Sequence, residues 1–179
     1  AKDAAAPLGV DRTTVEAAYR SIEARMELAP PATDPVERSL TTDADLHLIC
    51  ENGGIIRPAR IQDGKVEFFV PAGIQTVQIT SRTSRPYDVI GPFVDDRRNL
   101  GVLVGEIILS NGGSSRRITS HQVADTLFGW YALEGSHRWT SGKAPLSLGE
   151  RHDGNIALLS VEIAGAGPYF AETTATPVA

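Results

Sequence analysis

Short runs in which apolar and polar residues alternate, separated by Asn-Gly or Asp-Gly pairs, dominate the chain from residue 43 onward. Apolar residues take every second position in 46–50, 66–70 and 157–163, which places them on one face of an extended strand. The intervening pairs are Asn52-Gly53, Asp63-Gly64, Asn111-Gly112 and Asp153-Gly154. Because these residues readily adopt positive φ in a tight turn, the pattern predicts β-hairpins.

The segment 101–109, GVLVGEIIL, is apolar on both faces apart from Glu106, which is typical of a central strand in a sandwich. Short strands and frequent turns together predict an all-β fold, an antiparallel, jelly-roll-like β-sandwich over residues 41–179. A small closed barrel is the alternative architecture.

One N-terminal α-helix is expected over residues 14–28, where apolar residues recur at helical spacing. Thr13 can cap it, with Glu16 completing a capping box, and Glu16 can pair with Arg20 one turn later. The helix should end before Pro30-Pro31. Residues 1–40 therefore form a helical arm and a Pro-rich connector, and we expect the helix to lie against the main domain and to cover part of its apolar surface.

Composition excludes several classes of protein. A net charge of −5 over 179 residues argues against a nucleic-acid partner, which requires a basic surface. Cys50 is the only cysteine, so an intrachain disulfide and a Cys-rich zinc site are excluded, and its apolar surroundings predict a buried side chain. Because the sequence contains no run of about 18 apolar residues, we expect no membrane span.

Motifs that carry catalysis or cofactor binding are absent from the sequence. It has neither the G-x-S-x-G nucleophile elbow nor a glycine-rich phosphate loop. Its four histidines lack the spacing of zinc sites, although a site assembled from His137, His152 and an acid is left open. We therefore predict no catalytic residue, no cofactor and no metal.

Residues 129–148, GWYALEGSHRWTSGKAPLSL, gather both tryptophans with an acid and an arginine. Either Trp130 and Trp139 fill the core, or at least one indole is exposed as a platform for a flat apolar ligand face such as a sugar ring. Glu134 and Arg138 are expected to pair across a turn at Gly135-Ser136.

A second charged cluster, Asp95-Asp96-Arg97-Arg98, runs directly into the apolar segment 101–109. One interpretation is the beginning of a strand with ion-paired ends. The other is a ligand contact made by Asp95 and Arg97.

The two clusters together carry a resemblance. DDRRNLGVLVGEIIL followed by GWYALEGSHRWTSGKAPLSL is similar to the β-rich domain at the C-terminal end of many bacterial Hint-domain proteins. The same succession resembles β-sandwich modules attached to bacterial glycosyltransferases, and it covers about residues 43–165. The resemblance implies a glycan-handling context and a secreted or cell-surface location, and it transfers no catalytic residue.

These observations lead to three hypotheses of function. The first is a non-catalytic accessory module that binds carbohydrate or polysaccharide. Its candidate ligand-binding residues are Trp130, Tyr131, Glu134, Arg138, Trp139, Asp95 and Arg97. The second is a protein-interaction or assembly module of a larger bacterial surface or secreted protein, with the N-terminal helix or an edge strand as its contact. The third is a glycan-active hydrolase using Glu134 with Asp95 or Asp96, whose carboxylates would have to flank a glycosidic bond.

Overall fold

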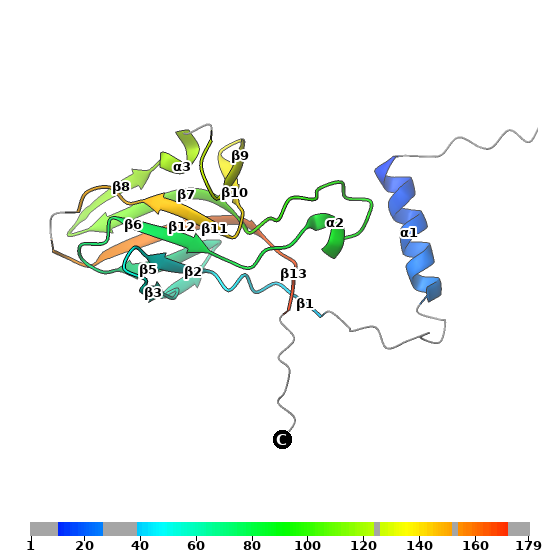
Figure 1. The fold of residues 1–179 in the computed structure, drawn as a ribbon, viewed down its shortest axis with the longest axis horizontal. Coiled ribbons are helices and arrows are strands. Elements are labelled where there is room, and N and C mark those ends of the chain that lie inside the picture. The colour runs from blue at the N-terminus through cyan, green and yellow to red at the C-terminus, as the bar shows by residue number, and fades with distance from the viewer. Residues whose placement is uncertain (1–10, 27–38, 124–125, 152–153, 172–179) are drawn as a thin grey trace, which may run out of the picture.

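The computed structural model describes residues 11–26, 39–123, 126–151 and 154–171. Within these ranges the chain is an antiparallel β-sandwich with one N-terminal helix, as predicted (Figure 1). The strands belong to separate sheets, so the alternative of a closed barrel is not what the described residues form.

The main sheet runs in the order β4-β5-β12-β7-β10-β9, with β8 also paired to β7. Its strands are β4 (Arg60–Gln62), β5 (Lys65–Val70), β7 (Val102–Asn111), β8 (Ser114–Ile118), β9 (Trp130–Glu134), β10 (His137–Thr140) and β12 (Ala157–Ala166). The second sheet runs β11-β6-β2-β3. Its strands are β2 (His47–Cys50), β3 (Ile55–Ile56), β6 (Thr76–Thr80) and β11 (Lys143–Ser147).

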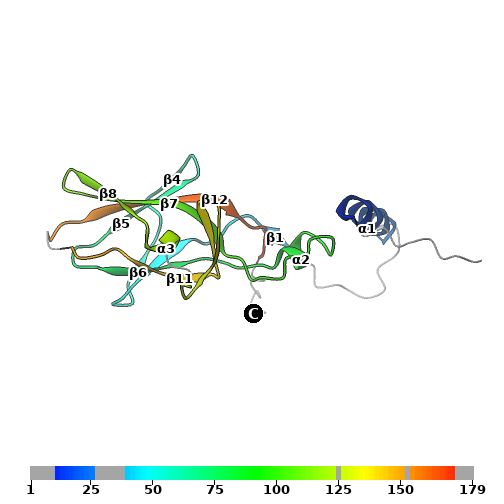
Figure 2. The ribbon, with the colours of Figure 1, turned by 90° about the horizontal axis from the view of Figure 1, so that it is seen from above.

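The core lies between these two sheets, which form separate layers in Figure 2. Alternate residues of β5, β7 and β12 are buried, as the period of two predicts. Phe68 and Leu159 from the main sheet and Leu48, Ile79 and Leu146 from the second are almost completely buried. Cys50 is buried with them, as predicted, and burial raises the pKa of its thiol. The other side of the main sheet is therefore an outer face, turned away from the core.

The predicted central strand is β7, which lies between β12 on one side and β10 and β8 on the other. Its pairing with β12 contains a bulge, because Glu162 of β12 lies opposite two residues of β7, Gly105 and Glu106. The carboxylate of Glu162 accepts a hydrogen bond of 2.8 Å from the backbone N–H of Glu106. A side chain on the outer face thus satisfies a backbone donor at the bulge.

The turn pairs predict most of the hairpins correctly. Asn52-Gly53 lies in the β2–β3 turn, and Asp63-Gly64 joins β4 to β5 with both residues at positive φ. The β7–β8 turn is displaced by one residue from the prediction, since Asn111 pairs with Ser114 and leaves Gly112-Gly113 as the turn. Asp153 lies outside the described residues, and β11 and β12 on either side of it belong to different sheets, so the hairpin prediction is wrong there.

The N-terminal helix α1 (Arg12–Met26) begins two residues earlier than predicted. Its cap is Asp11, whose carboxylate accepts a hydrogen bond from the N–H of Thr14, rather than Thr13. Arg20 pairs with Glu23 at 3.2 Å instead of with Glu16. None of the described helices is long and apolar enough to cross a membrane.

The helix stands beside the segment that carries α2 (Pro86–Val89), apart from both sheets (Figures 1 and 2). Its contact there is between the rings of Tyr19 and Phe93, whose centroids are 5.8 Å apart. The expectation that it covers the apolar surface of the sandwich is therefore wrong. Three short elements complete the fold: α3 (Ser120–Val123) and the paired strands β1 (Leu40–Thr41) and β13 (Tyr169–Phe170).

Candidate functional site

Trp130 is a core residue, in agreement with the first of the two alternatives for the tryptophans. It is 7% exposed, and its indole N–H donates a hydrogen bond of 3.0 Å to the carbonyl of Pro145. Its ring lies 5.4 Å from the buried imidazole of His121. Both the surface and the polar atom of this side chain are used within the fold, so Trp130 is removed from the candidate ligand-binding residues.

Arg138 is also buried, at 2% exposure. Its guanidinium donates to the carbonyl oxygens of Tyr131 and His121, the latter at 2.8 Å. In the β9–β10 hairpin, Arg138 lies opposite Leu133, whereas Glu134 lies opposite His137 and forms its ion pair with Arg98. The predicted Glu134–Arg138 pair is thus wrong, and Arg138 holds the backbone of β9 to α3.

Trp139 points the other way, onto the outer face of the main sheet, and is partly exposed. Pairing across three strands places Trp139, Leu103 and Gly165 in one row. The tip of the indole, Cη2, would lie 3.5 Å from a Cβ atom built on Gly165. The indole thus extends across β7 toward β12, with its tip at Gly165.

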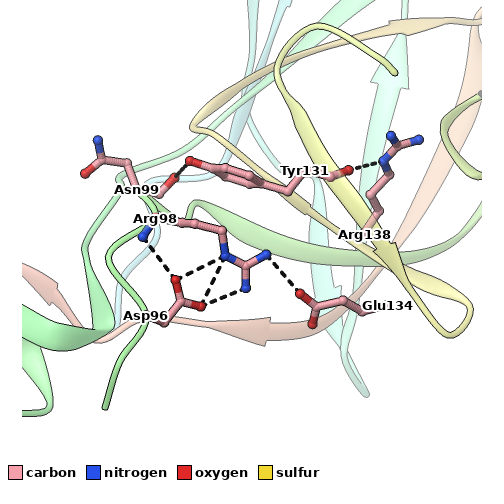
Figure 3. A network of polar contacts seen from close by, with 6 residues as sticks. All are labelled: Asp96, Arg98, Asn99, Tyr131, Glu134 and Arg138. Atoms are coloured by element: carbon pink, nitrogen blue, oxygen red, sulfur yellow. Dashed lines mark hydrogen bonds and ion pairs between the residues drawn. The ribbon is translucent and has the colours of Figure 1, made fainter. Parts of the chain in front are cut away.

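A network of charged residues surrounds Tyr131 of β9, the strand next to that of Trp139 (Figure 3). The guanidinium of Arg98 contacts Glu134 at 3.0 Å and Asp96 at 2.7 Å, and lies 5.3 Å from the centre of the Tyr131 ring. Tyr131 in turn donates its hydroxyl proton to the carbonyl of Asn99 at 3.0 Å. Figure 3 shows the Tyr131 ring and the Arg138 side chain extending in opposite directions from the hairpin.

The Arg98 network keeps the carboxylate of Asp96 ionised. Hydrogen bonding to Arg98 lowers the pKa of Asp96, and the same contacts raise the pKa of Arg98. A general acid in glycoside hydrolysis requires the opposite shift, a raised pKa. In addition, the Arg98 guanidinium lies between Asp96 and Glu134, where a glycosidic bond would have to fit.

Asp95 and Arg97 are not part of this network, although the sequence pointed to them. Both side chains are largely exposed, their nearest charged atoms are 3.8 Å apart, and Arg97 stacks 4.8 Å from the ring of Tyr87. The structure thus separates the predicted residues Asp95 and Arg97 from the network that their neighbours Asp96 and Arg98 form with Glu134. The alternation of direction along an extended segment, which separates 95 and 97 from 96 and 98, is the signal that could have distinguished them.

Two more polar side chains, His137 and Glu162, meet on the outer face at the β7 bulge. A Cβ atom built on Gly105 would lie 2.4 Å from a carboxylate oxygen of Glu162 and 3.0 Å from Cδ2 of His137. The absence of a side chain at Gly105 thus lets both residues lie over β7. We call the set Tyr131, Trp139, Arg98, Glu134, His137 and Glu162 the aromatic face.

Metal binding finds no support in the part of the chain that the structure describes, where no three potential ligands converge. His152, half of the alternative with His137, lies outside the described residues.

A separate pocket of about 420 Å³ opens between the sheets. Its floor includes the core residues Val66 and Val102, and the ion pair of Asp45 with Arg57, which lowers the pKa of Asp45, lies at its rim. Its lining includes no aromatic ring.

Comparison of the chain with protein-family models, with curated proteins and with solved structures gives no match. The resemblance noted in the sequence therefore remains a prediction.

Proposed function

We propose that this chain is a non-catalytic module that binds carbohydrate on the aromatic face. The observation that carries the proposal is the position of Trp139, a partly exposed indole on the outer face whose tip reaches Gly165 of β12. Its exposed ring surface is available to the apolar face of a sugar. Burial of such a ring surface is favourable in proportion to the apolar area removed from water.

The polar neighbours of Trp139 suit the hydroxyl groups of a sugar. Arg98 offers N–H donors, and Glu134 and Glu162 offer carboxylate oxygens on the same side of the sheet. Hydrogen bonds with a charged partner contribute about 1.5–3 kcal/mol. The mutual contacts of Arg98, Asp96 and Glu134 hold these groups in place before a ligand arrives, which reduces the entropy cost of binding.

Hydrolysis by Glu134 and an aspartate is the weaker alternative on the same residues. The lowered pKa of Asp96 and the position of the Arg98 side chain between the two carboxylates favour binding over bond cleavage. The aromatic ring also favours this face over the pocket beside Asp45, whose lining has none.

Tryptophan fluorescence tests the proposal directly. The protein is titrated with soluble xylan, galactomannan, mixed-linkage β-glucan and a soluble cellulose derivative, and with polygalacturonate as a polyanion. One of these should shift the emission, and acrylamide should quench one indole and not the other. Trp139→Ala should abolish binding, measured by isothermal titration because this variant lacks the indole that reports the ligand, whereas Phe128→Ala, which removes an aromatic ring that is 81% exposed, should leave both the shift and the binding unchanged.

Binding that survives Trp139→Ala, or a flat response across the whole panel, would contradict the proposal. Far-ultraviolet circular dichroism of each variant establishes that the fold is retained.

A second candidate, assembly through α1, is favoured by one observation. Ile22 is 56% exposed on a helix whose ring contact with the rest of the chain is made by Tyr19. If α1 contacts a second copy of the chain, light scattering should detect a dimer that Ile22→Asp disrupts.

A further inference from the structure

The outer face of the main sheet continues well beyond Trp139. Since Val66, Phe68 and Val70 of β5 point into the core, Lys65, Glu67 and Phe69 point outward. Register places Phe69 in one row with Leu158 of β12 and Ser110 of β7. This row and the row of Trp139 are seven residues apart along β7, which corresponds to roughly 20–23 Å of strand.

A hollow of about 640 Å³ lies at the Phe69 end of this face. Phe69 is 60% exposed, and Ile156 beside it is 65% exposed. The β7–β8 turn at Gly112-Gly113 forms part of the lining. The outer face thus has an aromatic ring at each end, Trp139 at one and Phe69 at the other. We call the hollow beside Phe69 the distal hollow.

Polar groups occupy the face between the two rings. From Trp139 toward Phe69, β12 presents Glu162 and then Ser160, which lies opposite Glu67 of β5 and Ile108 of β7. Glu106 and Arg117 form an ion pair alongside. Figure 2 shows the β7–β8 and β4–β5 hairpin ends standing above the layer of β7 and β12. A protein partner generally buries a continuous apolar centre, which this polar middle does not provide.

The charges of this surface favour an uncharged ligand. Ion pairs already hold Glu106 and Glu134, and Glu67 and Glu162 add further carboxylates to the face. A polyanion would be repelled by these groups and by the net charge of −5.

We infer that the outer face binds a neutral, linear polysaccharide that extends along β12 from Trp139 to the distal hollow. The inference rests on the proposed function and adds the class of ligand to it. Trp139 binds one sugar unit, Glu162 and Ser160 lie beside the units that follow, and Phe69 binds a unit farther along the chain. Affinity should therefore increase with the length of the glycan until both rings are covered.

The test uses the full chain and oligosaccharides of two to six sugars prepared from the neutral polysaccharide of the panel that binds most tightly. Isothermal titration should show affinity increasing through the series, because the span between the rings exceeds a disaccharide. Phe69→Ala should weaken binding of the longest oligosaccharide by about tenfold, equivalent to about 1.4 kcal/mol, and leave the shortest unchanged. Trp139→Ala should weaken binding at every length.

Ile55→Ala is the matched control. Ile55 is 61% exposed, which matches the 60% exposure of Phe69, but it lies on β3 in the second sheet. It should leave the affinity for every oligosaccharide unchanged. Because Phe69 is so exposed, its replacement is not expected to unfold the protein, and thermal denaturation checks this.

Three results would overturn the inference while leaving the proposed function intact: an affinity that does not depend on length, a Phe69→Ala variant that binds every length like the wild type, and a preference for polygalacturonate. The second would show that the distal hollow takes no part in glycan binding. Failure of every glycan to bind would instead reject the proposed function itself, and the inference with it.

Discussion

His121 and Gly105 connect the interior of the sandwich to its outer face, since Nε2 of His121 lies 2.9 Å from the carbonyl oxygen of Gly105. Gly105 belongs to the β7 bulge, and the side chains of Glu162 and His137 lie over its other side. Because the carbonyl is the acceptor, Nε2 carries the proton and Nδ1 does not. A buried, neutral imidazole thus supports the backbone beneath the aromatic face.

Stability should therefore decrease as the pH falls below the ordinary pKa of histidine, 6.5. Burial, reinforced by the positive charge of Arg138, lowers the pKa of His121 in the folded protein. A group with a lowered folded pKa contributes stability above its unfolded pKa, and this contribution is lost as the pH falls toward its folded pKa. Melting temperatures should consequently decrease from pH 7.5 to pH 5.

The matched variants are His121→Gln, which cannot titrate, and His137→Gln on the outer face. The first should flatten the dependence on pH above 5, and the second should retain it. Asp96 does not interfere with this comparison. Its pKa is lowered in the folded protein, so its contribution to stability is lost only as the pH falls below its ordinary pKa of 3.8. An equal slope in His121→Gln and the wild type would show that another group is responsible.

The two tryptophans should differ in what their removal costs. Trp130→Ala leaves a cavity between the sheets and an acceptor on Pro145 without its donor, so the free energy of unfolding should fall by about 3–5 kcal/mol. Trp139 is partly exposed, and Trp139→Ala should cost only about 1–2 kcal/mol. Urea denaturation measures both. Equal losses would mean that Trp139 is as much a core residue as Trp130.

The buried guanidinium of Arg138 should be more important for stability than the partly exposed one of Arg98. Arg138→Met removes the donors to two carbonyls, at about 1–3 kcal/mol for each carbonyl left without a partner. Arg98→Met breaks contacts that solvent screens, and should change the free energy of unfolding by about 0–1 kcal/mol. The same urea experiment compares them, and a larger loss for Arg98→Met would contradict the assignment of roles.

Much of the fold could be predicted from the sequence because turn chemistry and alternation are local properties. Asp63-Gly64 turns the chain where predicted, since both residues tolerate positive φ. The turn near Asn111 was displaced by one residue because Gly112-Gly113 offers the same freedom, and local sequence does not decide between the two registers. The segment at Asp153-Gly154 shows the limit: a turn pair does not reveal whether the next strand joins the same sheet.

The site was harder to predict, because burial of a charged residue depends on partners distant in sequence. Arg138 was expected at the surface beside Glu134, yet its donors reach carbonyls on β9 and α3 that only the tertiary fold brings together. Arg98 meets Glu134 across 36 residues of sequence. The sequence pointed to the hairpin and to the charged cluster that the fold brings together, but it did not determine which side chains of each face outward.

Gly165 offers the most selective test of the aromatic face. A Cβ atom there would make ordinary contacts of 3.5 Å with Trp139 and Leu103, so Gly165→Ala should leave both fold and binding nearly unchanged. Gly165→Leu would fill the space under the indole and lift Trp139 from the sheet. Its acrylamide quenching should then increase while glycan binding weakens by about tenfold or more, equivalent to about 1.4 kcal/mol. If Gly165→Leu binds as tightly as Gly165→Ala, the position of Trp139 of β10 beside Gly165 of β12 is not what creates the binding surface.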